Sequence, residues 1–284
     1  MDMTLREWVD LWLAMIEKTR AKNTYLIYSK GTQTFGELMN KKLTELTPKD
    51  ILLWNMTWPG TDKGKARNAL VLKTCLAGAV KMKLLAENPV PNLFKPSRIR
   101  PVNVAWTPAQ TKKFLEEAKG SKYENLFYLA IMTGARIGEL LGLRYEDLVG
   151  QDLRIERQAL EIRGARSIGY PKSGSRRLHL SIADRMRFGT GKGYVFANKN
   201  GQPTHKSSIY TEFYRVIAAA HVPRINFHSL RHINASYLLS SGIPVTVVSE
   251  RLGHAKVSTT LNIYAHSLPS RQEEASAAIG KLLG

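Results

Sequence analysis

Four side chains toward the C-terminal end of the chain have the types and spacing for work on a phosphate. His228 and Arg231 stand three residues apart, and residues with this spacing share one face of a helix. A guanidinium offers a planar, permanently charged fork for phosphate oxygens, and an imidazole can donate a hydrogen bond or move a proton. His254 follows in a second turn, and Tyr264, whose hydroxyl can be a nucleophile, lies ten residues beyond it. The segment therefore predicts a site where Tyr264 attacks a phosphate.

The charge of the chain indicates a polyanionic partner. Of the 284 residues, 42 are Lys or Arg and 23 are Asp or Glu, which gives a net charge of +19. Residues 1–100 hold 17 basic and 9 acidic residues, and residues 101–284 hold 25 and 14. Because both parts are basic and no polybasic tail carries the excess, we expect two folded units to grip a nucleic acid.

Composition excludes several other classes of protein. No apolar run approaches the roughly 20 residues needed to span a bilayer, and the N-terminus lacks a secretory signal pattern. The single cysteine, Cys75, excludes an internal disulfide framework and a cysteine-cluster metal site, and its apolar helical setting predicts a core position. We therefore expect a cytoplasmic protein.

Residues 1–90 predict an all-helical domain of four or five helices. A capping box at Thr4 begins the first helix, and Thr47-Pro48 begins a later one. Apolar residues from 65 to 84 recur at helical spacing and predict a long helix before Asn88-Pro89.

Residues 91–103 predict an extended basic linker between two domains. Four prolines lie between residues 88 and 101, so no core can form there. Lys95, Arg98 and Arg100 lie among them and are candidate contacts to a nucleic-acid backbone.

Residues 104–284 predict a second domain of helices with a small antiparallel sheet, so the whole chain is expected to be mainly α. Helices are predicted at about 108–119 and 121–132. Gly134 permits a tight turn that brings Arg136 to the next helix N-terminus, where anions are favoured.

Alternating apolar residues between 148 and 182 predict three short strands, the last containing Leu180 and Ile182. A basic turn over 170–177 separates the last two strands. Further helices are expected at about 206–220, from 229 to Gly242, and from Pro244 to Gly253.

Each of these pieces is weak alone, but in order and spacing they resemble the tyrosine recombinases, the phage-integrase family. The motifs that carry the resemblance are residues 133–139 (TGARIGE), Lys172 in a hairpin, residues 228–232 (HSLRH), residues 252–254 (LGH) and the Tyr264 segment. They cover the second domain nearly throughout. Residues 1–90 also look like the family's core-binding domain.

The resemblance implies a covalent reaction on DNA. Tyr264 would attack the scissile phosphate, form a 3′-phosphotyrosyl bond and free a 5′-hydroxyl. Because the bond energy is kept in the protein–DNA link, no ATP or other cofactor is implied. Arg136 and Arg231 would hold the non-bridging oxygens, where charge builds in the transition state, so no metal is implied either.

The resemblance also assigns supporting roles. Lys172 would protonate the leaving oxygen as general acid. His228 would assist proton movement, His254 would donate a hydrogen bond, and Glu139 would hold Arg136 or its helix in place. Neighbours of Lys172 are candidate contacts to the DNA backbone: Ser173, Ser175 and Arg177.

The family also implies an assembly. We expect a homotetramer on double-stranded recombination sites that exchanges strands through a Holliday junction to integrate or excise a mobile element. The tail from about residue 265 would dock on a neighbouring subunit. An arm-binding domain, which many integrases carry, has no room before the first helix. The chain is thus expected either to work without arm sites or to be a fragment.

Two alternatives remain open on the sequence. A type IB topoisomerase uses similar phosphotyrosyl chemistry to relax one duplex. A non-catalytic repressor is the other, because residues 244–264 resemble a helix-turn-helix. The DNA sequence of the site and the residues that read bases do not follow from these motifs.

Overall fold

The computed structural model describes residues 3–92, 105–162, 165–172, 174–264, 277 and 279–281, with the backbone alone at 162 and 262–264. The chain divides into two compact units, Met1–Pro101 and Val102–Gly284, called unit 1 and unit 2 below. Most of the predicted linker, including Lys95, Arg98 and Arg100, lies outside the described residues. The form of the linker therefore stays a prediction.

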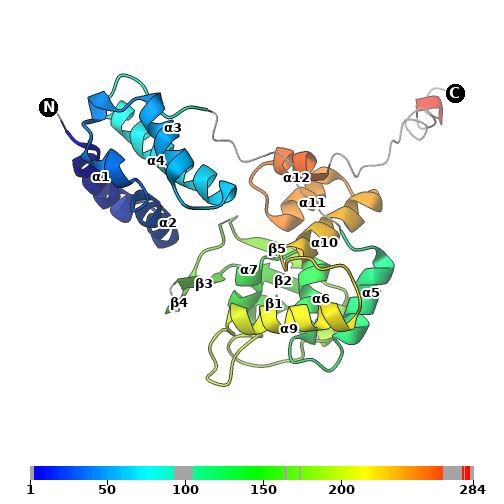
Figure 1. The fold of residues 1–284 in the computed structure, drawn as a ribbon. Coiled ribbons are helices and arrows are strands. Elements are labelled where there is room, and N and C mark those ends of the chain that lie inside the picture. The colour runs from blue at the N-terminus through cyan, green and yellow to red at the C-terminus, as the bar shows by residue number, and fades with distance from the viewer. Residues whose placement is uncertain are drawn as a thin grey trace. The chain divides into compact units, whose positions relative to one another are not determined.

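The described part of unit 1 is helical (Figure 1). Its helices are α1 (Leu5–Thr19), α2 (Lys22–Thr32), α3 (Pro48–Thr57) and α4 (Asp62–Lys81), with 3₁₀ turns η1 (Gly36–Asn40) and η2 (Leu43–Glu45) between α2 and α3. The capping box predicted at Thr4 and the helix start predicted at Thr47-Pro48 are confirmed. The long helix begins earlier than predicted, because the Thr61 side chain accepts from the Gly64 N–H and caps it.

The core of unit 1 lies where α1, α2 and α4 pack together. Trp8 is buried, and its indole Nε1 donates to the Cys75 carbonyl at 3.0 Å. Cys75 is itself fully buried, as predicted, and burial raises the pKa of its thiol to about 12. The thiol is therefore a protonated core group.

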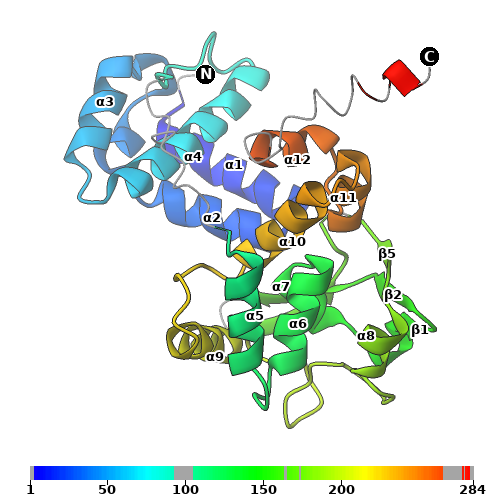
Figure 2. The ribbon, with the colours of Figure 1, turned by 90° about the vertical axis from the view of Figure 1, so that its right-hand side faces the viewer.

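Unit 2 combines eight α-helices with two small sheets in its described residues (Figure 2). The helices are α5 (Pro108–Glu117), α6 (Glu124–Thr133), α7 (Ile137–Gly142), α8 (Ile182–Met186), α9 (Lys206–Ala219), α10 (Ser229–Ser240), α11 (Val245–Leu252) and α12 (Val257–Tyr264), with a 3₁₀ turn η3 (Tyr145–Asp147). Helix α10 packs on α6 and α11, and α12 packs on α11. The helix ends predicted at Gly134, Gly242 and Gly253 are present, each with a positive φ.

The sheet prediction is correct in type and wrong in detail. Strands β1 (Leu148–Val149), β2 (Asp152–Ile155) and β5 (Arg176–His179) form one antiparallel sheet in the order β1-β2-β5. Strands β3 (Gln158–Ile162) and β4 (Ala165–Gly169) form a second, two-stranded sheet. Four of the five residues of β4 are exposed, so no apolar alternation marks it.

Two further expectations about this region are wrong. Ile182 begins helix α8 instead of ending a strand, because Ser181 accepts from the Asp184 N–H and caps a helix there. The turn that carries Lys172 joins β4 to β5, and these strands belong to different sheets. It is therefore a crossover between sheets and not a hairpin.

An aromatic cluster fills the core of unit 2. Phe114, Phe127 and Phe213 contact one another with ring centroids 5.5 to 5.7 Å apart. Trp106 packs against Phe114 and donates to the Pro223 carbonyl at 2.8 Å. Within the described residues of both units, no helix has the length and apolar character to cross a membrane.

Candidate active site

The turn between α6 and α7 places Arg136. Gly134 ends α6 in the left-handed conformation, with φ +63°, and its N–H donates to the Ala130 carbonyl at 3.0 Å. A Cβ at Gly134 would lie 2.5 Å from Leu252 Cδ2 and 2.9 Å from Asn234 Oδ1, so glycine is required. The chain then turns so that Arg136 is the N-cap residue of α7, close to its predicted place.

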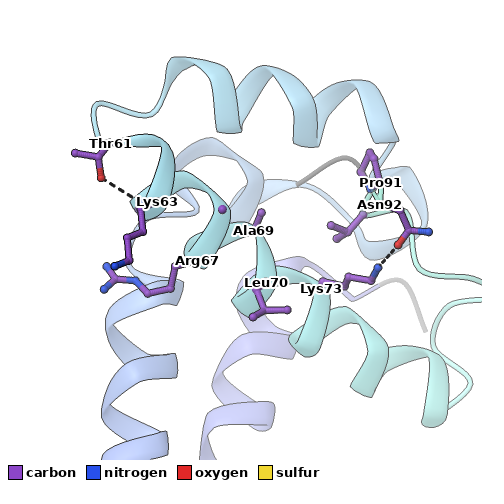
Figure 3. Close-up of a pocket in the computed structure, with 11 residues that line it drawn as sticks. Thr61, Lys63, Arg67, Ala69, Leu70, Lys73, Pro91 and Asn92 are labelled. Carbon is purple, nitrogen blue, oxygen red and sulfur yellow. Dashed lines mark hydrogen bonds between the residues drawn. The ribbon is translucent and has the colours of Figure 1, made fainter. Parts of the chain in front are cut away.

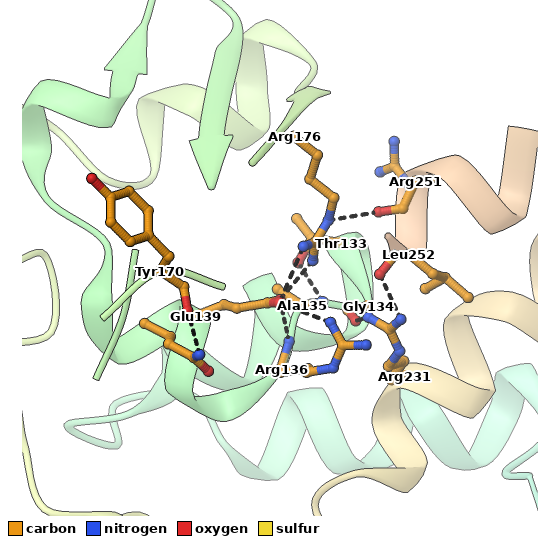
Figure 4. Close-up of polar contacts among 11 residues, drawn as sticks. Thr133, Gly134, Ala135, Arg136, Glu139, Tyr170, Arg176, Arg231, Arg251 and Leu252 are labelled. Carbon is orange, nitrogen blue, oxygen red and sulfur yellow. Dashed lines mark hydrogen bonds and ion pairs between the residues drawn. The ribbon is translucent and has the colours of Figure 1, made fainter. Parts of the chain in front are cut away.

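A buried carboxylate contacts two arginines at this turn (Figure 4). Glu139 Oε2 accepts from the Arg136 backbone N–H at 2.9 Å, and Oε1 accepts from Arg136 Nη1 at 2.9 Å. Arg176, at the start of β5, donates from Nη1 to Oε1 at 3.1 Å and from Nη2 to Oε2 at 2.6 Å. The contact that the sequence predicted between Glu139 and Arg136 is thus present, with Arg176 as an additional partner.

The two arginines keep Glu139 ionised. Burial of Glu139 opposes ionisation, but hydrogen bonds and charge from Arg176, with the Arg136 backbone N–H and charge, outweigh it and lower the pKa of Glu139 to about 2. Its side chain is fully buried, whereas that of Arg136 is 30% exposed. Arg136 is therefore held from the protein side and still reaches solvent.

Arg231 is buried and held by carbonyl groups from two other segments. Its Nη1 donates to the Gly134 carbonyl at 2.8 Å, and its Nη2 donates to the Leu252 carbonyl at 2.5 Å. Carbonyl oxygens satisfy the guanidinium without neutralising its charge. Arg231 therefore brings a positive charge from α10 to the turn that bears Arg136.

This positive charge helps to lower the pKa values of two histidines that the sequence predicted for the site, His228 and His254. Burial, followed by the charges of His232, Arg231 and Arg136, lowers the pKa of His228 to about 4. Burial, followed by Arg231 and Arg136, also lowers the pKa of His254 to about 4. The burial of His228 is only partial, because the residue is also exposed to solvent. With pKa values of about 4, both imidazoles are neutral near pH 7. The shared influence of the two arginines indicates one electropositive site.

Local contacts orient both imidazoles. The His228 ring meets the His232 ring edge to face, with centroids 5.2 Å apart. His254 Nδ1 lies 2.8 Å from the hydroxyl of buried Thr260 in α12. If the hydroxyl donates to Nδ1, the proton of the neutral ring is on Nε2, which can then donate to an anion.

Lys172 is exposed in the turn between β4 and β5. Tyr170 at one end of the turn accepts from Gln158 Nε2 at 2.6 Å through its carbonyl, and Arg176 at the other end contacts Glu139. Two of the neighbours predicted to contact the DNA backbone, Ser175 and Arg177, are exposed. Arg177 also forms an ion pair with Asp152 at 3.5 Å. Ser173 lies outside the described residues.

Tyr264 is the last residue of helix α12. Its backbone belongs to the helix that also supplies Thr260 to His254, while its side chain lies outside the described part of the structure. The predicted docking tail likewise falls almost wholly outside the described residues. Its contacts and the position of the Tyr264 hydroxyl therefore stay predictions.

Arg176 and Arg251 are site residues that the sequence analysis missed. Arg176 Nε donates to the Arg251 carbonyl at 3.0 Å, and Arg251 Nη2 donates to the Met132 carbonyl at 2.9 Å. In the sequence Arg176 stands beside Arg177 in a basic run that looks solvated. Strand alternation, which turns neighbouring residues to opposite faces, is the one signal that separates the two.

Unit 1 contains a separate hollow of about 710 Å³ (Figure 3). Ala66, Ala69 and Leu70 of α4 line it on one side, and residues 90–92 line it on another. Lys73 donates to Asn92 at its edge. The lining is mainly apolar with basic side chains around it, and it contains none of the predicted catalytic residues.

Relatives of the chain include recombinases and integrases. A tyrosine recombinase XerC-like protein of Caldanaerobacter subterraneus subsp. tengcongensis is 27% identical, over 99% of this chain and 84% of that protein. The integrase of Mycobacterium phage L5 is 26% identical, over 99% of this chain and 80% of that protein.

Solved structures share the fold. The Tn1549 transposon integrase, in complex with a circular intermediate DNA, has a TM-score of 0.81 at 20% identity, covering 98% of this chain and 99% of that one. A lambda integrase (75–356) dimer bound to a COC′ core site has a TM-score of 0.67 at 19% identity, covering 90% and 97%.

The family comparison confirms the resemblance that the sequence motifs carry. Residues 106–271, more than half of the chain, match the phage integrase family. This range includes the turn at Arg136, the Glu139 carboxylate with its two arginines, the two neutral histidines and the end of α12 at Tyr264. The chain therefore belongs to the phage integrase family and is a tyrosine recombinase, an enzyme that transfers DNA strands.

Proposed function

We propose that this enzyme is a site-specific recombinase that cuts and rejoins double-stranded DNA through a covalent bond between Tyr264 and a 3′-phosphate. The observation that carries the proposal is the convergence of Arg136 and Arg231 on one turn. Arg231 donates to the Gly134 carbonyl across 97 residues of sequence, and burial together with the charges of both arginines lowers the pKa values of His228 and His254. Two permanent cations and two neutral imidazoles suit a phosphate that gains charge in its transition state.

The cleavage step can be written with these side chains. The Tyr264 oxygen bonds to phosphorus, and the bond from phosphorus to the 5′-oxygen breaks. The neutral His228 ring accepts the tyrosine proton. Its pKa of about 4 in the DNA-free protein keeps the ring unprotonated, and the negative charge of the bound phosphate raises that pKa and so makes the ring a stronger base. The exposed ammonium of Lys172 gives a proton to the leaving oxygen. Arg136 and Arg231 hold the non-bridging oxygens, and His254 donates from Nε2.

Rejoining reverses the step with a different strand. A 5′-hydroxyl from a partner duplex attacks the phosphotyrosyl bond and releases Tyr264, so the number of phosphodiester bonds is unchanged. Two such exchanges make and resolve a Holliday junction. The names of the relatives, which include phage, prophage and transposon integrases, favour integration or excision of a mobile element.

Assembly is proposed by analogy with a related structure. Lambda integrase, with a TM-score of 0.68 at 18% identity, was solved as a tetramer bound to a Holliday junction. We infer four copies of this chain on two DNA sites, with the tail from residue 265 as a contact between copies. Tetramers on DNA that persist in a chain ending at residue 269 would exclude the tail from this role.

A Tyr264→Phe variant tests the proposed function. With its own recombination site on a nicked suicide duplex, the wild-type chain should accumulate a covalent protein–DNA complex that resists denaturing electrophoresis. The variant should bind the same duplex with similar affinity and form no covalent complex, because it lacks the attacking oxygen.

The matched control is Tyr123→Phe, which removes a hydroxyl at the N-terminal end of helix α6, the end opposite to Gly134. This control should keep wild-type cleavage. Covalent complexes formed by Tyr264→Phe would refute the assignment of the nucleophile. Relaxation of plasmids that lack any recombination site would favour a topoisomerase instead.

A further inference from the structure

Arg176 is a buried arginine that the cleavage step does not use. Its side chain is 6% exposed, against 30% for Arg136. Its Nη1 and Nη2 both donate to Glu139, and its Nε donates to the Arg251 carbonyl (Figure 4). Arg231 is buried to a similar degree, at 3% exposed, but it donates to neutral carbonyls, whereas Arg176 forms a two-point ion pair with the Glu139 carboxylate. The charge of Arg176 is therefore directed at Glu139.

The balance of charges around Glu139 suggests a role for Arg176. Glu139, Arg136 and Arg176 together carry one negative and two positive charges. A carboxylate facing Arg136 alone would neutralise it, and an incoming phosphate would compete with that carboxylate for one guanidinium. With Arg176 present, the phosphate meets a group of net positive charge.

We propose that Arg176 is a positioning residue for strand cleavage. It neutralises Glu139 from the buried side, so that Glu139 fixes the orientation of Arg136 without cancelling its charge toward the scissile phosphate. The inference rests on the proposed function, because it requires a phosphate that Arg136 holds.

The contacts of Arg176 also join the segments that carry the other predicted groups. Arg176 begins β5, four residues after Lys172. Its Nε bond reaches the Arg251 carbonyl, and the next carbonyl along the chain, that of Leu252, accepts from Arg231. The bidentate contact to Glu139 completes the link to the turn of Arg136. A planar fork with this reach is specific to arginine.

A double-mutant cycle over Arg176 and Glu139 tests the inference. The rate of covalent complex formation is measured in a single turnover at saturating enzyme on the suicide duplex. Arg176→Gln should lower this rate on the order of 10- to 100-fold, because an uncompensated Glu139 draws Arg136 away from the phosphate. Arg176→Lys, which keeps the charge and loses the fork, should fall between wild type and Arg176→Gln.

The decisive comparison uses a neutral residue at 139. In the Glu139→Gln background no negative charge needs neutralising, so adding Arg176→Gln should change the rate by less than about threefold. The double variant should also cleave faster than Arg176→Gln alone. If Arg176→Gln lowers the rate by the same factor in both backgrounds, Arg176 does not act through Glu139 and the inference is overturned.

The control is Arg157→Gln. Arg157 also pairs with a buried carboxylate in unit 2, but through a single nitrogen, Nη1, which lies 2.8 and 2.6 Å from the two oxygens of Asp147. Its loss should lower thermal stability without changing the cleavage rate. Should Arg176→Gln fail to fold, Arg176→Lys is compared in the wild-type and Glu139→Gln backgrounds instead. An equal loss of cleavage rate in both backgrounds would again overturn the inference. Absence of covalent complex from the wild-type chain would instead refute the proposed function itself.

Discussion

Under the proposed function, the pKa values of His228 and His254 set both rings for phosphate chemistry before DNA binds. Both sit near arginines that cannot lose their charge, and burial removes part of the water that would stabilise an imidazolium. The pKa of each falls to about 4. A neutral ring can accept a proton or donate one hydrogen bond. The negative charge of a bound phosphate would raise both pKa values and favour proton uptake during the reaction.

These shifts predict a pH dependence of stability in the DNA-free protein. Both pKa values lie below the ordinary 6.5 of histidine, so between pH 6.5 and about 4 the unfolded chain binds more protons than the folded one. The free energy of unfolding should therefore fall as pH falls through this window. Urea unfolding at several pH values measures the effect.

The control for this prediction is the double variant His228→Asn/His254→Asn. Its stability should depend less on pH over the same window, by up to about two protons in the linkage slope. His232, whose pKa is also lowered by burial and Arg231, remains in both proteins. Identical slopes for the two proteins would contradict the shifted pKa values.

Residue roles could be predicted from the sequence only where a motif carries them. The order of Arg136, Lys172, His228, Arg231, His254 and Tyr264 led to the family, which the family match confirms. Arg176 could not be found this way, since its burial depends on β5 passing between Glu139 and the end of α11. Strand alternation distinguishes Arg176 from Arg177, but it does not show that Arg176 lies against Glu139, which is a tertiary fact.

At the scale of elements, the site is built from the C-terminal ends of two helices. The last carbonyls of a helix have no partner within it and carry partial negative charge. At the end of α6, the Ile131 and Met132 carbonyls accept from Asn234, and the Gly134 carbonyl accepts from Arg231. At the end of α11, the Leu252 carbonyl accepts from Arg231. Helix ends thereby hold the arginine without neutralising it.

Gly134 is the element-scale position most sensitive to substitution. In Gly134→Ala, a positive φ would be imposed on a residue with a Cβ, and that Cβ would collide with Leu252 and Asn234. We expect a loss of about 1–3 kcal/mol from backbone strain, with a further loss from the collision. Urea denaturation measures both together.

Gly120→Ala separates the two contributions. Gly120 has φ +75° and nothing within 4 Å of an added Cβ, so it reports backbone strain alone. Gly134→Ala should be the more destabilised of the two and should also cleave DNA more slowly, because the acceptors of Arg231 are displaced. Equal destabilisation would show that the packing against Leu252 and Asn234 is not tight.

The elements themselves were predictable where their signals are local. Thr4, Thr47 and Thr107 cap the helices that follow them, and each capping box is present in the structure. The strands were harder, because β4 is exposed on both faces and β5 is reached by a crossover between sheets. Strand pairing depends on partners distant in sequence, which a local pattern does not show.

At the scale of the whole molecule, basic charge is divided between two units with separate cores. Residues 1–100 hold an excess of 8 basic residues, and residues 101–284 an excess of 11. Each unit buries its own hydrophobic cluster. Under the proposed function, each unit brings its own set of cations to the DNA backbone, and binding should release counterions at both.

This division predicts how salt weakens binding. For a protein with 6–10 phosphate contacts, affinity for a duplex falls by roughly 10³- to 10⁵-fold between 50 and 200 mM salt. The full chain should fall in this range, and a fragment of residues 102–284 should bind more weakly with a shallower slope of log affinity against log salt. Fluorescence anisotropy with one labelled duplex measures both. Because the fragment keeps Arg136, Arg231 and their neighbours, equal slopes would mean that unit 1 makes no phosphate contacts and that its positive charge serves another purpose.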